Sequence, residues 1–248
     1  MIKQSPSLVD FHTHSRFSPD ATGEIIEMCQ IALSKGISAL AITDHCEMNA
    51  PDWGEGYEKT ILESHLATTG AAKVYDGRLR VAVGMELGQP LQNLPLTEKL
   101  LRTHSFDFII GSLHNCSEKP DFYYIDFASP ETDTVALLHT YYKELLEMVQ
   151  WGKFDVLGHL TYPFRYANGV FSLGIPLDPY LECIDEIFRT LIAKGKGIEV
   201  NTSGLRQGLN ETLPNFSLLR RYREWGGEIL TVGSDSHCPD LVLSLIHI

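Results

Sequence analysis

The sequence lacks any apolar run long enough to cross a membrane, and it lacks paired cysteines. No stretch approaches the roughly 18–20 apolar residues that a spanning helix requires, so we expect no membrane association. The start, MIKQSPSLVDF, has no basic-then-apolar export signal, and the five cysteines show no Cys-x-x-Cys spacing. Both absences favour a cytoplasmic protein with reduced thiols.

Basic residues are also scarce. The chain has 20 Lys and Arg against 32 Asp and Glu, which gives a formal net charge of −12. A nucleic-acid surface would need a basic stripe, so nucleic acid is not an expected partner. An anionic small molecule remains compatible with this charge, because bound divalent ions would concentrate positive charge at one spot.

What the sequence does contain is an alternation of short apolar runs and helical patterns. The expected strands cover 8–14, 38–45, 81–87, 106–114, 154–160, 197–203 and 228–237. The expected helices cover 23–36, 55–75, 97–104, 132–151, 178–195 and 215–226, the first with Thr22 as its cap candidate. This rhythm predicts one α/β domain with a parallel sheet that is closed or nearly closed.

Metal-binding residue types stand at the ends of nearly all these strands. Six of the ten histidines do so, together with two carboxylates: His12, His14, His45, His114, His159, His237, Glu86 and Asp235. Side chains that follow successive parallel strands meet at one rim of a sheet or barrel. A single such histidine is more often a core or capping residue, but six in register argue against coincidence. Nitrogen and oxygen donors without paired cysteines predict a multi-metal hydrolytic centre.

The same motifs resemble a known family. HTHS, TDH, MEL, GSLHN, GHLTYP and GSDSH occur in the order found in the PHP superfamily of metal phosphoesterases. That resemblance implies an irregular seven-stranded (βα) TIM-like barrel. The segments FDVLGHLTYPFRY, IEVNTSGLR and LTVGSDSH are most similar to the histidinol-phosphate phosphatases of histidine biosynthesis. The implied reaction is hydrolysis of histidinol phosphate to histidinol and phosphate by attack of a metal hydroxide.

The resemblance also implies the metal ligands. His12, His14, Glu86 and Asp235 would hold one ion; Glu86, His114 and His159 a second; Asp20, His45 and His237 a third. We therefore expect two to three divalent ions, with zinc, iron and manganese all suited to these ligands. The alternative for Asp20 is a turn residue in SPDATG, where Asp is favoured for local hydrogen bonds.

Four further roles follow from the pattern and the resemblance. Glu86 and Asp235 would be catalytic through the ions, and Asp44 would orient an imidazole or relay a proton. Arg165 would bind the substrate phosphate, because a guanidinium suits bidentate phosphate contacts. Arg206 is a second candidate for substrate binding. The alternative for both arginines is a surface position in a loop.

Two rival functions stay open at this point. One is a PHP phosphoesterase of other specificity, for phosphotyrosine or another small phosphate ester. The other is a catalytically silent PHP binding module, against which the complete ligand set speaks. A small phosphate ester is the only partner that the sequence predicts, and it leaves the oligomeric state open.

The C-terminal end is unusual for a barrel. Only residues 238–248 follow the last motif, too few for a covering helix, and LSLIHI resembles the translation of a sequencing adaptor. We therefore expect a single domain over 1–242, a non-native tail over 243–248 and a missing C-terminal helix. A short natural tail is the alternative.

Overall fold

The computed structural model describes residues 8–49 and 56–246. Its centre is a sheet with strand order β1-β2-β4-β5-β6-β7-β8, and β3 pairs with β4 beside this path. All pairings are parallel. The strands are β1 (Leu8–Asp10), β2 (Ile37–Ile42), β3 (His45–Glu47), β4 (Arg80–Gly88), β5 (Phe108–Ser112), β6 (Val156–Leu157), β7 (Gly197–Asn201) and β8 (Leu230–Gly233).

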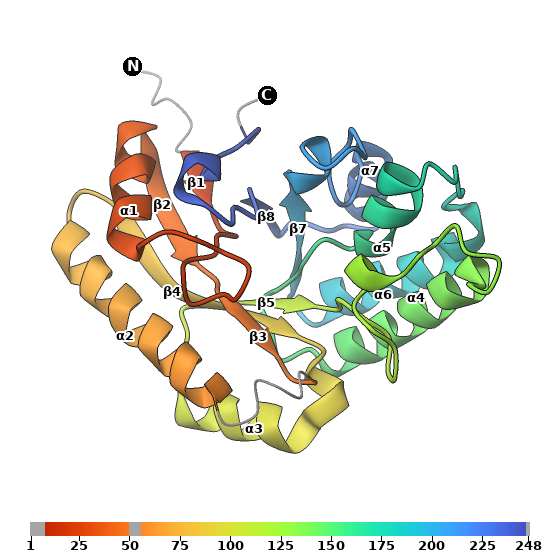
Figure 1. Cartoon of the computed structure of the whole chain (residues 1–248), viewed down its shortest axis with the longest axis horizontal. Helices are drawn as coiled ribbons and strands as arrows, with labels where there is room; N and C mark the ends of the chain where they lie inside the picture. The colour runs from red at the N-terminus through yellow and green to blue at the C-terminus, as the bar shows by residue number, and fades with distance from the viewer. Residues whose placement is uncertain (1–7, 50–55, 247–248) are drawn as a thin grey trace.

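The first and last strands lie side by side and nearly close the sheet into a barrel (Figure 1). The Phe11 amide donates to the Val232 carbonyl at 2.9 Å, and the Asp235 amide donates to the His12 carbonyl at 2.8 Å. The predicted seven-stranded TIM-like barrel is therefore confirmed. One expected strand, 38–45, is divided into β2 and β3, because the Thr43 amide turns to the Thr13 carbonyl at 2.8 Å.

Helices lie outside the strands (Figure 1). They are α1 (Ile25–Ser34), α2 (Gly56–Tyr75), α3 (Leu94–Thr103), α4 (Thr134–Trp151), α5 (Tyr162–Phe164), α6 (Leu181–Ala193) and α7 (Phe216–Glu224). None of the helices in the described ranges is both long and apolar enough to span a membrane.

Several helix starts differ from the sequence prediction by one to three residues, and in two of them the capping residue explains the difference. Thr22 is not the cap of α1: Glu24 precedes that helix without a side-chain cap bond, and the Thr22 amide donates to the His237 carbonyl at 2.8 Å. Helix α3 begins earlier than expected, at Leu94, because the Asn93 side chain accepts from the Leu96 amide and so caps the helix.

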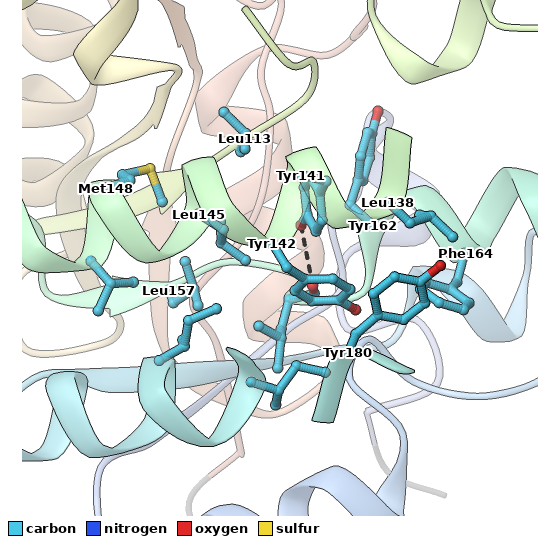
Figure 2. Packing of buried hydrophobic residues seen from close by; sticks show 14 of the residues in the cluster. Leu113, Leu138, Tyr141, Tyr142, Leu145, Met148, Leu157, Tyr162, Phe164 and Tyr180 are labelled. Carbon is cyan, nitrogen blue, oxygen red and sulfur yellow. Dashed lines mark hydrogen bonds between the residues drawn. The ribbon is translucent and has the colours of Figure 1, made fainter. Parts of the chain in front are cut away.

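The largest apolar core lies between α4 and α6 and the adjoining part of the sheet (Figure 2). Tyr141 and Tyr142 of α4 are fully enclosed there, with Tyr180 against Tyr142. The Tyr141 hydroxyl donates to the Leu160 carbonyl at 3.1 Å. Since Leu160 directly follows His159, this bond fixes the chain at the carboxyl end of β6.

A second core packs α1 and α2 on β2 and includes Val242 and Leu243. The Leu243 amide donates to the Asp10 carboxylate at 2.7 Å. Ile229 and Leu230, at the start of β8, are 45% and 48% exposed.

The expected tail at 243–248 stays a prediction, and its residues 247–248 lie outside the described part of the chain.

Candidate metal centre

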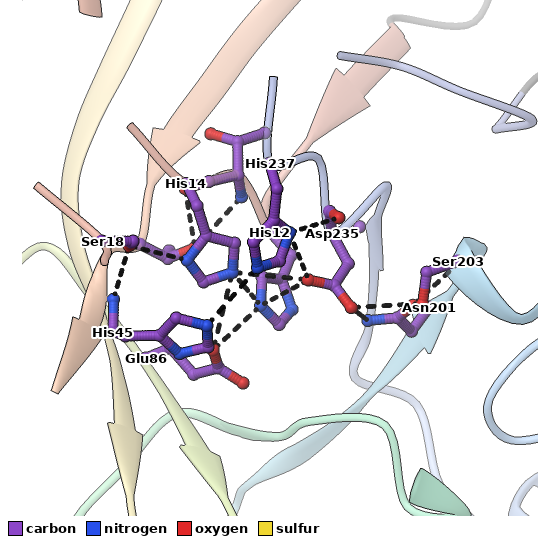
Figure 3. A network of polar contacts seen from close by, with 12 residues as sticks. His12, His14, Ser18, His45, Glu86, Asn201, Ser203, Asp235 and His237 are labelled. Atoms are coloured by element: carbon purple, nitrogen blue, oxygen red, sulfur yellow. Dashed lines mark hydrogen bonds and ion pairs between the residues drawn. The ribbon is translucent and has the colours of Figure 1, made fainter. Parts of the chain in front are cut away.

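The structure gathers the predicted ligands in one cluster at the carboxyl ends of the strands. Figure 3 shows His12, His14, His45, Glu86, Asp235 and His237 of this cluster. The Nε2 atoms of several pairs of histidines lie close together. The Nε2 atoms of His12 and His14 are 3.0 Å apart, and those of His45 and His237 are 3.4 Å apart. On the other side of the cluster, the Nε2 atoms of His114 and His159 are 3.2 Å apart.

Glu86 lies between two groups of histidines. Its Oε1 is 2.8 Å from His159 Nε2 and 3.2 Å from His114 Nε2. Its Oε2 is 3.4 Å from His12 Nε2 and 2.8 Å from His45 Nδ1. One carboxylate thus presents one oxygen to each group, which is the arrangement expected of a residue that belongs to two of the predicted metal sites.

The donor sets in the structure overlap with the predicted sites but are not identical to them, since the third contains His14 in place of Asp20. Three sets of donors, each within 4.8 Å of one another, contain only predicted ligands: His12, His14 and Asp235; Glu86, His114 and His159; and His14, His45 and His237. A fourth set joins His45 and His114 to Glu47, which the sequence analysis did not single out.

Asp20 lies at the rim of the same cluster, although its side chain is 57% exposed. Its Oδ2 is 3.2 Å from His237 Nε2 and 3.6 Å from His45 Nε2. Burial raises the pKa of Asp20, but hydrogen bonds with His237 and His45 outweigh burial and hold the pKa below its usual range. The carboxylate is therefore charged and placed beside the third set.

The cluster fits divalent metal ions, as judged by its unsatisfied atoms. Glu86 Oε2 and His45 Nδ1 are both buried, and neither has a hydrogen-bond partner among the described residues. They are 2.8 Å apart but not aligned as donor and acceptor. Buried polar atoms without partners are costly, and cations placed between convergent imidazoles and carboxylates would satisfy them.

His14 differs in its electrostatics from His12, His45 and His114, whose pKa values are raised, against the effect of burial, by neighbouring carboxylates. Burial, followed by the neighbouring charges of His45 and His237, lowers the pKa of His14 to about 3. The imidazole is therefore neutral near pH 7, which is the form that binds a metal.

Two carboxylates that the sequence analysis missed contact the Nδ1 atoms of predicted ligands. Glu199 Oε1 is 2.6 Å from His12 Nδ1, and Glu47 Oε1 is 2.9 Å from His114 Nδ1. Such contacts fix the ring orientation and tautomer of a metal-binding histidine. Signals for both existed in the sequence: Glu199 interrupts the apolar strand run IEV, and Glu47 stands two residues after His45.

Asp44 lies behind the cluster and not at its open face. It accepts hydrogen bonds from the Ser15 amide at 2.6 Å, the Ser18 hydroxyl at 2.8 Å and the Ser64 hydroxyl at 2.6 Å. Ser18 Oγ is in turn 3.1 Å from His14 Nδ1. Asp44 thus contacts the ligands through Ser18, in keeping with the predicted orienting role.

The two arginines occupy different positions. Arg165 is buried and lines the pocket, with Nη2 donating to Ser203 Oγ at 2.5 Å and Asp235 Oδ2 at 3.1 Å. Its Nε has no hydrogen-bond partner among the described residues. Arg206 instead donates to the main-chain carbonyls of Ser234 and Asp235, at 2.8 and 3.1 Å.

A pocket of about 710 Å³ opens above the cluster. Arg165, Glu86 and Asp235 are part of its lining, and His12 and His14 lie fully buried beneath. The remaining wall is aromatic and acidic, with Asp121, Tyr123, Tyr124, Tyr162 and Tyr166. A site with metal donors at its floor and an aromatic wall can hold a small anionic ester by both ends.

Comparison with known proteins decides the family. The PHP domain model matches residues 10–203. The chain belongs to the PHP domain family. It is 30% identical over 94% of its length, and 87% of the relative's, to a Deinococcus radiodurans protein named "Probable histidinol-phosphatase". It is 25% identical to the histidinol-phosphatase of Lactococcus lactis, covering 92% of this chain and 84% of the relative.

The fold of this PHP protein is also that of a solved structure. The crystal structure of histidinol phosphate phosphatase from Lactococcus lactis, complexed with zinc, L-histidinol and phosphate, superposes with a TM-score of 0.77 at 24% identity. The match covers 93% of this chain and 86% of the other.

Proposed function

We propose that the protein is a metal-dependent phosphatase that hydrolyses histidinol phosphate to histidinol and phosphate, as a cytoplasmic enzyme of histidine biosynthesis. The observation that carries this proposal is Glu86, whose two oxygens face two histidine groups under a pocket that also contains Arg165. The names of the relatives and the L-histidinol and phosphate bound to the Lactococcus lactis structure support the same substrate.

The residues of this chain have separable roles in the proposal. His12, His14, Glu86 and Asp235 would hold one divalent ion, Glu86, His114 and His159 a second, and Asp20, His45 and His237 a third. Zinc, iron or manganese, when bound, would supply an activated water and neutralise phosphoryl charge. Arg165, which lines the pocket, would bind a phosphoryl oxygen through its guanidinium, of which Nη2 also donates to Ser203 and Asp235.

Second contacts keep these groups in place. Glu199 and Glu47 orient His12 and His114, and Asp44 orients His14 through Ser18. Asp44 would also take part in proton movement along that path, although it does not line the pocket. This preorganisation lets the site bind phosphate without rearranging.

A second candidate is a phosphatase for another small phosphate ester, such as phosphotyrosine. Relatives named only as phosphatases support it, among them one from Vibrio cholerae at 26% identity over 94% of this chain. A catalytically silent binding module is disfavoured, because the donor sets at the pocket floor are complete.

The test is phosphate release from histidinol phosphate, phosphotyrosine and p-nitrophenyl phosphate at equal concentrations. We expect the highest kcat/KM for histidinol phosphate, loss of activity with a chelator, and recovery on adding zinc, iron or manganese. A higher kcat/KM for phosphotyrosine would favour the second candidate. Activity that survives complete metal removal would reject the metal-dependent reaction.

A further inference from the structure

An aromatic wall leads away from the metal-ligand cluster inside the pocket. The Tyr162 ring lies 4.8 Å from the His159 ring and 5.0 Å from the His114 ring, between centroids. Its hydroxyl is 2.9 Å from the Tyr166 hydroxyl, and the Tyr166 ring meets Tyr123 edge-on at 6.2 Å. Tyr162, Tyr166 and Tyr123 therefore form a continuous tyrosine wall from the cluster to the pocket mouth.

One carboxylate at this wall differs from the others in the pocket. Asp20, Glu47, Glu86 and Asp235 each lie within 4.0 Å of an imidazole or guanidinium nitrogen. Asp121 lines the same pocket, and within residues 8–49 and 56–246 no Lys, Arg or His forms an ion pair with it. Its carboxylate therefore forms no close ion pair with these residues, although the charge of His114 acts on it from farther away.

The position of Asp121 is fixed by its neighbours. Its Oδ1 accepts from the Tyr123 amide at 2.7 Å, and the next amide, of Phe122, donates to the His114 carbonyl at 3.0 Å. Phe122 is fully buried and packs edge-on against Tyr141 at 5.5 Å. Burial raises the pKa of Asp121, a cost that a cation bound beside it would relieve.

We propose that Asp121 is the receptor for a protonated amine on the alcohol half of the substrate, with the tyrosine wall covering the carbon skeleton. This rests on the proposed function and names the substrate class as phosphate esters of amino alcohols. The ester phosphate occupies the cluster end of the pocket, and the ammonium group lies against Asp121 and the tyrosine rings. An alcohol half with a net negative charge is repelled by the same carboxylate.

The test compares Asp121→Asn with Asp126→Asn, on metal-loaded protein of residues 1–248. Asn keeps the oxygen that accepts from the Tyr123 amide and removes the charge. Asp126 is the matched control: it is exposed, accepts from the Ala128 amide at 3.0 Å, and lies outside the pocket lining. The substrates are histidinol phosphate and its des-amino analogue, 3-(imidazol-4-yl)propyl phosphate.

We expect Asp121→Asn to lower kcat/KM for histidinol phosphate on the order of tenfold or more, mainly through KM. The des-amino analogue should change less than about twofold, and Asp126→Asn should change neither. An equal loss of kcat/KM on both substrates would contradict the amine-binding role of Asp121. So would equal kcat/KM values of the wild type for histidinol phosphate and the des-amino analogue.

A binding measurement separates this inference from the proposed function. Calorimetric affinity for histidinol should fall in Asp121→Asn, whereas affinity for 4-(3-hydroxypropyl)imidazole should not. Amine-dependent binding without phosphate release by the wild type would reject the phosphatase and keep the receptor. Phosphate release with unchanged histidinol affinity in the variant would reject the receptor and keep the phosphatase.

Discussion

The guanidinium of Arg206 donates to the main-chain carbonyl of Asp235 at 3.1 Å and to that of Ser234 at 2.8 Å. Asp235 has a φ of 53°, in the left-handed region that non-glycine residues seldom adopt. Such a conformation persists only where surrounding contacts enforce it. Arg206 therefore supports the conformation that directs the Asp235 carboxylate toward His12 and His14.

The first prediction separates this support from direct substrate binding. Arg206→Met should reduce kcat and the bound metal by roughly 10–100-fold, the range found for contacts that orient metal ligands, with little change in inhibition by inorganic phosphate. Arg206→Lys should restore part of the loss. Arg223→Met, which removes an exposed arginine bonded to the Gly227 carbonyl, is the control. A raised KM at unchanged kcat would instead assign Arg206 to substrate binding.

Glu86 gives the second prediction. Glu86→Gln should abolish activity, on the order of a thousandfold or more, and release at least one metal ion, because the amide nitrogen cannot serve as the second ligand oxygen. Circular dichroism should show an intact fold. Metal analysis by mass spectrometry is the measurement, with the exposed Glu228→Gln as control. Full metal occupancy in an inactive variant would give Glu86 a purely catalytic role.

How far the sequence predicts a contact in this site depends on how many residues separate its two partners along the chain. His12 and His14 could be proposed together from the sequence, because alternation in an extended run places residues i and i+2 on one side, although β1 itself ends at Asp10. The contact of His12 with Glu199 joins residues 187 positions apart and forms only because the barrel closes between β1 and β8. No local pattern encodes this particular contact.

Asp121 shows a second limit of sequence reasoning. It lies in a segment without strand or helix periodicity, and its place in the pocket depends on Phe122 packing into the core beside His114. The barrel itself was predictable, because apolar runs and helical segments alternate along the whole sequence. The orientation of loop side chains was not.

The third prediction concerns Arg165. Arg165→Ala should lower kcat/KM without changing the metal content. The loss should correspond to about 1.5–3 kcal/mol of transition-state stabilisation, the range for a hydrogen bond to a charged group. Because Arg165 also pairs with Asp235 at 3.1 Å, Arg165→Lys is the companion variant: it keeps the charge and loses the fork geometry. Steady-state kinetics on both variants, with exposed Arg189→Ala as control, give the answer. Unchanged kinetics would leave Arg165 without a role in phosphate binding.

The last prediction tests stability away from the site. Asp185 of α6 accepts from Arg221 Nη2 of α7 at 2.6 Å and from the Trp225 indole at 2.8 Å. The hydrogen bond from Arg221 is the main reason why the pKa of Asp185 lies below its ordinary value of 3.8. The Asp185 carboxylate therefore stabilises the fold at pH values above its pKa in the unfolded chain. This contribution disappears as the pH falls through the lower pKa of the folded protein.

Asp185→Asn should accordingly lower the free energy of unfolding by roughly 1 kcal/mol or less, since Arg221 is partly exposed. Thermal melts should show a constant difference from wild type between pH 7 and pH 5, which shrinks once the pH is below 3.8. Glu186→Gln, on the same helix with an exposed partner in Arg189, is the matched control and should show little difference at any pH. A difference for Asp185→Asn that is the same at pH 7 and pH 3 would mean that the α6–α7 contact is held by packing and neutral hydrogen bonds and not by charge.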